Sequence, residues 1–154
     1  MIEATAKEIA SEHQRTRRRA RISSTDIVSQ PVRVQLSRRK GARLGKNTIS
    51  VARPSKWGNP FKVTPERSQI LAVGAFQTWL TAEGVTAGIA DRKQWMIDNL
   101  KELRGKNLAC WCKIIDEAGN YVQCHADILL AVANGMTQDE VRNENLKAHE
   151  GRQK

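Results

Sequence analysis

Three cysteines and one histidine lie close together in the chain, and there is no other cysteine. Cys110 and Cys112 flank Trp111, and Cys124 and His125 follow after eleven further residues. Thiolates and imidazole are the ligands of structural zinc, so these four residues are a candidate Cys3His metal site with zinc as the expected ion. In an extended segment Cys110 and Cys112 point to one face and Trp111 to the other. The spacing is unusual, because paired zinc cysteines commonly have two to four residues between them.

The same residues also suit two other interpretations. Cys124 and His125 precede an apolar helical segment, and a helix N-terminus stabilises a thiolate. Cys124 could then act as a catalytic nucleophile with His125 as its base, and Asp127 could orient His125 or cap the helix. In the third interpretation the cysteines are small buried apolar residues. The sequence leaves a metal site, a reactive thiol and a packed corner open.

A second segment, residues 53–61, has the composition of a ligand-binding loop. Its two prolines and its Gly-Asn pair exclude regular structure. Its cations suit phosphate, its tryptophan suits stacking on a base, its glycine permits close approach, and its asparagine can read a base edge. The candidate ligand-binding residues are Arg53, Lys56, Trp57, Gly58 and Asn59. The alternative is that Trp57 and Phe61 fill the core and the rest forms a turn.

The positive charge of the chain is concentrated near its N-terminus. The formal net charge is +10, and residues 1–46 hold twelve of the 26 Lys and Arg residues but only four of the 16 acidic ones. Such asymmetry favours a nucleic acid or nucleotide partner, and the alternative is a solvated basic tail. The candidate nucleic-acid-binding residues are Arg15, Arg17, Arg18, Arg19, Arg21, Arg38, Arg39, Lys40, Arg43 and Lys46.

Length and composition limit the class of protein. The 154 residues suffice for one domain with a hydrophobic core. There is no apolar run of about 18 residues and no signal-peptide pattern, so we expect no membrane partner. An odd number of cysteines, two of them one residue apart, is untypical of a disulfide scaffold. A reducing, cytoplasmic setting is therefore expected.

Hydrophobic periodicity predicts the elements that carry these segments. Alternating apolar residues predict strands at 32–36 and 48–52, joined as a hairpin by a long basic loop, and a short buried strand at 107–111. In the first strand Arg33 lies on the face opposite to Val32, Val34 and Leu36. Each of the two chemically promising segments begins where a strand ends. Parallel neighbouring strands would bring both segments into one crevice.

Helical patterns occupy most of the remaining chain. A marginal helix is predicted within 2–21, and a second from Thr64–Pro65 to about residue 80. A third begins at about residue 89 and stops at Gly105, and a fourth over 126–133 ends at Asn134–Gly135. Thr137 and Glu140 form a capping-box pattern for a short exposed helix in the polar tail. The expected fold is α/β, a small sheet of about three or more strands with helices packed on it. We expect a partly ordered basic arm at 1–46 that could include the strand at 32–36, a compact α/β domain at 47–135, and a polar tail or short helix at 136–154.

Four short motifs in order carry a family resemblance. They are VARPSKWGNPF at Val51–Phe61, LRGK at Leu103–Lys106, CWC at Cys110–Cys112 and CHAD at Cys124–Asp127. Together they resemble the domain-of-unknown-function family 4326 of bacteria and many bacteriophages, over about residues 48–134. The chain departs from the pattern in Lys113–Gln123, because the family has only a few residues there. The resemblance implies no reaction, since the family's activity is unassigned.

The residues themselves suggest two functions of different kinds. The first is a protein directed at nucleic acid or nucleotides, in which the loop Arg53–Asn59 binds phosphate and base beside the Cys/His corner. Such a protein could process a nucleotide or a base as an enzyme. The second is a non-enzymatic module, stabilised by zinc, that binds nucleic acid or protein. Metal content and the surroundings of Arg53 and Trp57 distinguish the two.

Overall fold

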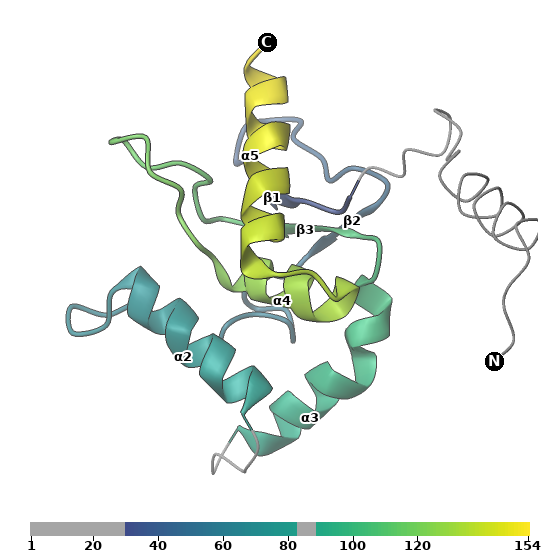
Figure 1. Ribbon diagram of the computed structural model, residues 1–154, viewed down its shortest axis with the longest axis vertical. Coiled ribbons are helices and arrows are strands. Elements are labelled where there is room, and N and C mark those ends of the chain that lie inside the picture. The colour runs from purple at the N-terminus through teal and green to yellow at the C-terminus, as the bar shows by residue number, and fades with distance from the viewer. Residues whose placement is uncertain (1–29, 83–88) are drawn as a thin grey trace, which may run out of the picture.

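The computed structural model describes residues 30–82 and 89–154. Within them three short strands form one parallel sheet in the order β1-β3-β2. The strands are β1 (Arg33–Gln35), β2 (Thr48–Ser50) and β3 (Asn107–Cys110). Four helices accompany it within the same ranges: α2 (Gln69–Thr81), α3 (Ala90–Asn99), α4 (His125–Asn134) and α5 (Gln138–Gln153). The helix α4 packs directly on the sheet, and α2 and α5 pack on α4 (Figure 1). The predicted α/β class, with a small sheet and helices packed on it, is confirmed.

The predicted hairpin between the first two strands does not form. The central strand β3 separates them, with Ala109 opposite Val34 on one side and opposite Ser50 on the other. Both pairings are parallel, so residues 37–47 connect the two edges of the sheet instead of making a tight turn. Because β2 and β3 end at the same edge of the sheet, the segments that follow them, residues 53–61 and 110–112, lie close together. This agrees with the crevice predicted from the sequence.

The helix α2 begins later than the sequence predicts. It spans Gln69–Thr81, whereas Thr64–Pro65 is the expected start. Ser68 supplies the cap, because its side chain accepts a hydrogen bond from the amide of Leu71. Thr64 instead pairs with Arg67 in an isolated bridge that precedes the helix.

The predictions for the next helices are close to the observed bounds. The helix α3 spans Ala90–Asn99 and continues as the 3-10 helix η1, Leu100–Leu103. The chain then turns at Gly105, which has a φ of 69° that glycine adopts without strain. The expected helix within 2–21 lies outside the described residues.

The helix α4 is the centre of the molecule. It spans His125–Asn134 and ends at Gly135 in the left-handed conformation, as predicted. It contacts β1, β3, α2, η1 and α5, and it lies near the middle of Figure 1 with α5 above it and α2 and α3 below. Its first turn therefore brings Cys124, His125 and Asp127 to the place where the sheet and the other helices meet.

The C-terminal residues form a longer helix than the sequence suggests. The helix α5 spans Gln138–Gln153, and Thr137 and Glu140 form the predicted capping box. Its buried residues Val141 and Asn145 lie against the body of the protein, so much of this polar segment is an integral part of the fold. The boundaries expected at 47 and 135 leave out α5 and also β1, although the structure packs both against α4.

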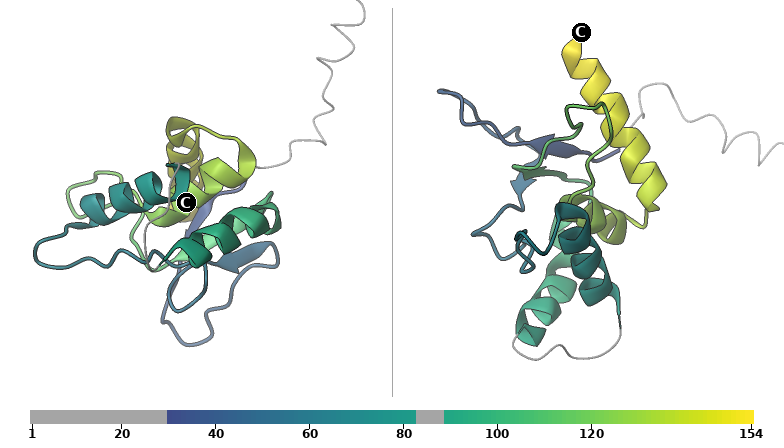
Figure 2. Two further views of the ribbon diagram at one scale, coloured as in Figure 1. Left: turned by 90° about the horizontal axis from the view of Figure 1, so that it is seen from below. Right: turned by 90° about the vertical axis from the view of Figure 1, so that its left-hand side faces the viewer.

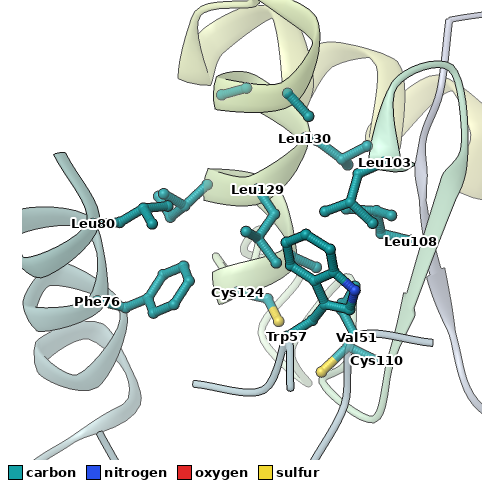
Figure 3. Close-up of a cluster of buried hydrophobic side chains, with 14 of the residues drawn as sticks. Val51, Trp57, Phe76, Leu80, Leu103, Leu108, Cys110, Cys124, Leu129 and Leu130 are labelled. Carbon is teal, nitrogen blue, oxygen red and sulfur yellow. The ribbon is translucent and has the colours of Figure 1, made fainter. Parts of the chain in front are cut away.

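The hydrophobic core lies between α4, α2 and the strand β3. Phe76, Leu103, Leu108 and Leu129 are all fully buried in it. Figure 3 shows the sulfur atoms of Cys110 and Cys124 at one margin of this cluster. Within the described ranges, no helix has the length and apolar character needed to cross a bilayer.

Candidate functional site

Cysteine and histidine atoms converge where β3 ends and α4 begins. The ligand atoms of Cys110, Cys124 and His125 all lie within 4.8 Å of one another, and these residues are buried. Cys112 adjoins them, because its Sγ is 3.8 Å from the Sγ of Cys110. Cys110, Cys124 and His125 therefore form a group, drawn from two segments, that could hold a metal ion, with Cys112 next to it.

The distances in this group match the edges of a tetrahedral metal site. Bonds of about 2.3 Å to sulfur and about 2.05 Å to nitrogen give tetrahedral edges of about 3.8 Å between sulfurs and about 3.6 Å between sulfur and nitrogen. The Cys110–Cys112 sulfur distance is 3.8 Å. The Nδ1 atom of His125 is 3.4 Å from the sulfur of Cys124 and 4.0 Å from that of Cys110. The unusual sequence spacing thus does not prevent Cys110, Cys124 and His125 from meeting, and it leaves Cys112 beside Cys110.

The His125 ring is held in the orientation that a metal ligand needs. Its Nε2 atom lies 2.8 Å from the carbonyl oxygen of Val51. A carbonyl can only accept, so Nε2 carries the proton and the lone pair of Nδ1 faces the sulfurs. Phe76 packs edge-on against the ring with centroids 5.6 Å apart, which further fixes its plane. A backbone carbonyl on the far nitrogen is the usual outer partner of a metal-bound histidine.

The thiols differ in their tendency to ionise. Hydrogen bonds from Cys110 and Cys112 hold the pKa of Cys124 well below its usual value against the opposing effect of burial, and the charge of Arg33 adds to the lowering. Hydrogen bonds with Cys110 and Cys124, together with burial, raise the pKa of Cys112. Among these thiols the lowered pKa favours ionisation of Cys124, which is fully buried.

Asp127 belongs to a different set of contacts from the one expected. Its carboxylate accepts hydrogen bonds from the Cys124 amide at 3.0 Å, Tyr121 Oη at 2.9 Å and Asn145 Nδ2 at 2.9 Å. It also pairs with the Arg33 Nε at 3.3 Å. The carboxylate therefore caps α4 and neutralises Arg33, and this corrects the expectation that Asp127 orients His125. Capping, the other role considered for it, is present.

Arg33 is a buried charged residue that the sequence pattern gives little reason to expect. It is 1% exposed although it lies in an edge strand, where alternation places it opposite the apolar face. Its Nη2 donates to the carbonyls of Val122 at 2.6 Å and Lys113 at 3.4 Å. Its backbone amide donates to Asn145 Oδ1. A lone arginine between two valines is the only signal that could have suggested a buried ion pair.

The interval that departs from the family pattern supplies part of this network. Residues 113–123 fold back on themselves through a bridge between Ile115 and Tyr121. Asp116 stabilises the turn by accepting hydrogen bonds from the Ala118 and Asn120 amides. The turn places the Tyr121 hydroxyl beside the Asp127 carboxylate and the Val122 carbonyl beside the Arg33 guanidinium.

Some residues of the loop 53–61 fill the core and others line a cavity, so each of the two predicted roles applies to part of the loop. Trp57 is 6% exposed and packs on Trp95, with ring centroids 4.9 Å apart. It therefore fills the core, as Figure 3 shows, and this corrects the prediction that its ring stacks on a ligand. Lys56 lies over the Trp95 ring at 4.9 Å. Only Arg53 and Asn59 of the five candidates line the adjacent cavity.

Backbone contacts explain why this loop is rigid. The Arg92 guanidinium from α3 donates to the carbonyls of Ser55, Lys56 and Gly58 at 2.6–3.3 Å. A Cβ atom on Gly58 would lie 2.6 Å from Cγ of Arg53, so glycine is required by the close approach of that side chain. No sequence signal singled out Arg92, which belongs to a helix distant along the chain.

Asn59 has a structural role alongside its place at the cavity. Its Nδ2 donates to the Ala72 carbonyl at 3.1 Å, and its Oδ1 accepts from the Phe61 amide at 2.8 Å. Both functional groups of the amide are therefore engaged within the protein. Asn59 fixes the loop against α2, which leaves Arg53 as the polar side chain of the loop with its charge available to a ligand.

A cavity of about 250 Å³ joins the two segments. Cys110, Cys112, Cys124 and His125 line it together with Arg53. The remaining lining is mostly apolar and comes from the 53–61 loop, α2 and the strand ends: Ala52, Asn59, Phe61, Val63, Gln69, Ala72, Val73 and Trp111. The crevice that the sequence analysis expected is present, with the Cys/His group on one wall and Arg53 on another.

The candidate nucleic-acid-binding residues fall into two groups. Arg15, Arg17, Arg18, Arg19 and Arg21 lie outside the described residues. The other five are exposed in the connection between β1 and β2: Arg38, Arg39, Lys40, Arg43 and Lys46. Trp111, which was not among the predicted ligand-binding residues, is 46% exposed and borders the cavity. Its position opposite the two flanking thiols is the signal that could have identified it.

Comparison with known proteins yields one family. The model of a family described as a domain of unknown function, DUF4326, matches residues 34–135. Neither the curated proteins nor the solved structures contain a match to the chain.

Proposed function

We propose that this chain, which belongs to the DUF4326 family of domains of unknown function, is a zinc-stabilised domain that binds a nucleotide unit of nucleic acid or a free nucleotide. The observation that carries the proposal is the single cavity lined by Arg53 and by the Cys/His group. The metal shapes one wall, and the arginine supplies the charge that holds phosphate.

Zinc is the ion that this donor set favours. Three thiolates and one neutral imidazole select zinc over magnesium or calcium, which prefer oxygen ligands. Cys110, Cys124 and His125 are buried within the core, as is usual for a structural ion. The binding energy of such an ion is also folding energy, because the unfolded chain does not preform the site.

The cavity suits one phosphate-bearing unit rather than a large cofactor. Its volume of about 250 Å³ lies just below the usual range for ligand sites, about 300–1,000 Å³. The apolar side chains of Phe61, Val63 and Val73 can cover a base, and the Arg53 guanidinium can bind phosphate oxygens in a bidentate manner. No carboxylate lines this cavity in the described part of the chain, so nothing there repels an anion.

Metal analysis tests the zinc part of the proposal. Purified protein should contain about one zinc per chain, and removal by a chelator should unfold it, since a structural zinc contributes about 10–16 kcal/mol in small domains. Restoring zinc should restore the circular dichroism spectrum. Metal-free protein with an unchanged melting temperature would exclude a zinc-stabilised domain.

Binding of nucleoside monophosphates tests the Arg53 part. Arg53→Ala should weaken binding by about ten- to a hundredfold, since a hydrogen bond to a charged group contributes about 1.5–3 kcal/mol, and it should leave the melting temperature nearly unchanged because Arg53 is exposed. Lys56→Ala is the matched control, since Lys56 is a cation of the same loop that does not line the cavity. Equal losses in both variants, or none in either, would refute the assignment.

One observation favours an enzyme as the second candidate. Cys112 is only half-buried, whereas the other three donors are buried and form the mutually close group. Three protein ligands with an open position are typical of catalytic zinc. The enzyme hypothesis predicts that Cys112→Ala keeps stoichiometric zinc and that nucleotide addition changes the absorption spectrum of cobalt-substituted protein. Loss of metal in Cys112→Ala would favour the closed structural site.

A further inference from the structure

An exposed tryptophan connects the Cys/His cavity to the basic loop. Trp111 directly follows β3 and is 46% exposed, an unusual position for so large an aromatic side chain. It borders the cavity described above and also a second, shallow cavity of about 650 Å³. That second cavity is lined by Gln35, Leu36, Ser37, Arg38, Arg39 and Trp111. One side chain therefore belongs to both hollows.

Arg38 lies beside Trp111 because the parallel strands β1 and β3 end together. In β1 and β3, Gln35 is opposite Cys110, and the Leu36 amide donates to the Cys110 carbonyl at 2.8 Å. The residues that follow these strands therefore leave the same edge together. The Arg38 guanidinium carbon lies 4.9 Å from the centre of the Trp111 ring, and this contact orients the ring.

The loop that continues from Arg38 carries positive charge without acidic residues. Residues 37–47 contain five Lys or Arg and no Asp or Glu. All five are exposed, and the ion pairs found in the described ranges involve other residues. The right-hand view of Figure 2 shows the segment between β1 and β2 extending away from the sheet, where its charges are accessible.

We infer that Trp111 and the basic loop 37–47 bind a single-stranded nucleic acid, one nucleotide of which enters the Cys/His cavity. This inference rests on the proposed function, since it extends the nucleotide site to a polymer. Phosphates of the strand lie along Arg38, Arg39 and the following cations, and a base stacks on the free face of Trp111. The next unit reaches Arg53.

The chemistry of the surface selects a single strand over a duplex. Stacking on a side chain requires an unstacked base, which a single strand offers without breaking base pairs. The cavity is also too small to admit a base pair, and residues 37–47 form no helix that could enter a duplex groove. RNA and DNA share the features that this site recognises.

Fluorescence anisotropy with labelled oligonucleotides tests the inference on the full chain. A short single-stranded RNA, the DNA of the same sequence and the corresponding DNA duplex serve as probes. Trp111→Ala should weaken binding of the single strands about tenfold or more, and Trp111→Phe should retain most of the affinity. The loss should persist at raised salt, where purely electrostatic binding by other basic segments is weak. Zinc content measured in both variants shows that the neighbouring thiols are intact.

Charge variants provide the second arm of the test. Arg38→Ala combined with Arg39→Ala should lower the slope of the salt dependence of binding by about 0.7 for each phosphate that the variant no longer neutralises. Arg152→Ala, which removes an exposed arginine from α5, should change neither affinity nor slope. Tighter binding of RNA than of DNA, or the reverse, identifies the natural strand.

The outcomes separate this inference from the function on which it rests. Wild-type levels of strand binding in Trp111→Ala, or equal binding of duplex, would overturn the inference, as would a wild-type chain that binds no strand. Mononucleotide binding that depends on Arg53 would then still support the nucleotide site. Strand binding that depends on Trp111 but is unchanged in Arg53→Ala would support the surface formed by Trp111 and the loop 37–47, and it would refute the role of Arg53.

Discussion

Two buried polar groups meet at the first turn of α4. The Cys/His group lines the cavity and brings together sulfur atoms and an imidazole lone pair. Next to it, the Arg33–Asp127 ion pair forms a hydrogen-bonded network with Tyr121 and Asn145. Both groups are enclosed by the same helix, strands and loop.

The two groups differ in how their hydrogen-bonding capacity is met. In the network, Asn145 receives a bond from the Arg33 amide and donates to Tyr121 and Asp127, so its amide is fully engaged. In the Cys/His group several electron-pair donors converge, and His125 gives its one proton to Val51. Buried polar groups are normally paired. In the network oxygen acceptors meet most of the donors, although Nη1 of Arg33 has no hydrogen-bond partner among the described residues, whereas converging sulfur and nitrogen lone pairs are the arrangement that an ion completes.

The largest expected effect comes from removing the innermost thiol. Cys124→Ala should abolish stoichiometric zinc binding and lower the free energy of unfolding by more than about 5 kcal/mol, because the energy of zinc binding is lost with the site. Zinc content and chemical denaturation measure the two effects. If the variant keeps its stability and the wild type binds no metal, the two polar groups do not differ as we conclude.

An intermediate effect is expected from breaking the ion pair of the network. Arg33→Met leaves the buried Asp127 carboxylate without its cation, which should cost about 3–5 kcal/mol of unfolding free energy. Zinc content at low denaturant should remain close to that of the wild type. Loss of zinc before loss of fold would show that Arg33 serves the metal site more than the network.

A double variant supplies the control for this measurement. Adding Asp127→Asn to Arg33→Met removes the unpaired charge but keeps a side-chain oxygen that can accept from the Cys124 amide. The double variant should therefore be more stable than Arg33→Met alone. Simple additivity of the two effects would argue that the residues are not coupled, contrary to their 3.3 Å separation.

The smallest expected effect comes from one hydroxyl group. Tyr121→Phe removes the donor to Asp127 and one acceptor of Asn145, while Asn145 still bonds Asp127 directly. The decrease in unfolding free energy should be about 1 kcal/mol, typical of one hydrogen bond, with zinc content unchanged. Thermal unfolding of the zinc-loaded protein measures it. A decrease as large as that of Arg33→Met would show that the hydroxyl organises the whole network.

Local sequence signals predicted those features that depend on neighbouring residues in the chain. The capping box of Thr137 and Glu140, the turn at Gly105 and the end of α4 at Gly135 all follow from short-range chemistry. The predicted start of α2 was wrong because Thr64–Pro65 and Ser68 both carry cap signals. The structure uses Ser68, and Thr64 pairs with Arg67 ahead of the helix.

The two tryptophans beside the candidate site show the limit of such signals. Sequence context suggested Trp57 as the ligand-binding aromatic, but the structure buries it against Trp95 and exposes Trp111 instead. Both residues adjoin polar or reactive positions, so composition cannot distinguish them. Their exposure depends on which helices cover each loop, and this is a property of the assembled fold.

The sequence by itself determined the residue types of the site, the helices around it and the order of its two segments along the chain. Only the tertiary structure decided that β3 separates β1 from β2, that Arg33 is buried against Asp127, and that the thiols and Arg53 share a cavity. Local patterns follow from contacts between residues a few positions apart. The fold around the site joins residues up to 112 positions apart, such as Arg33 and Asn145, which only the packing of the whole chain brings together.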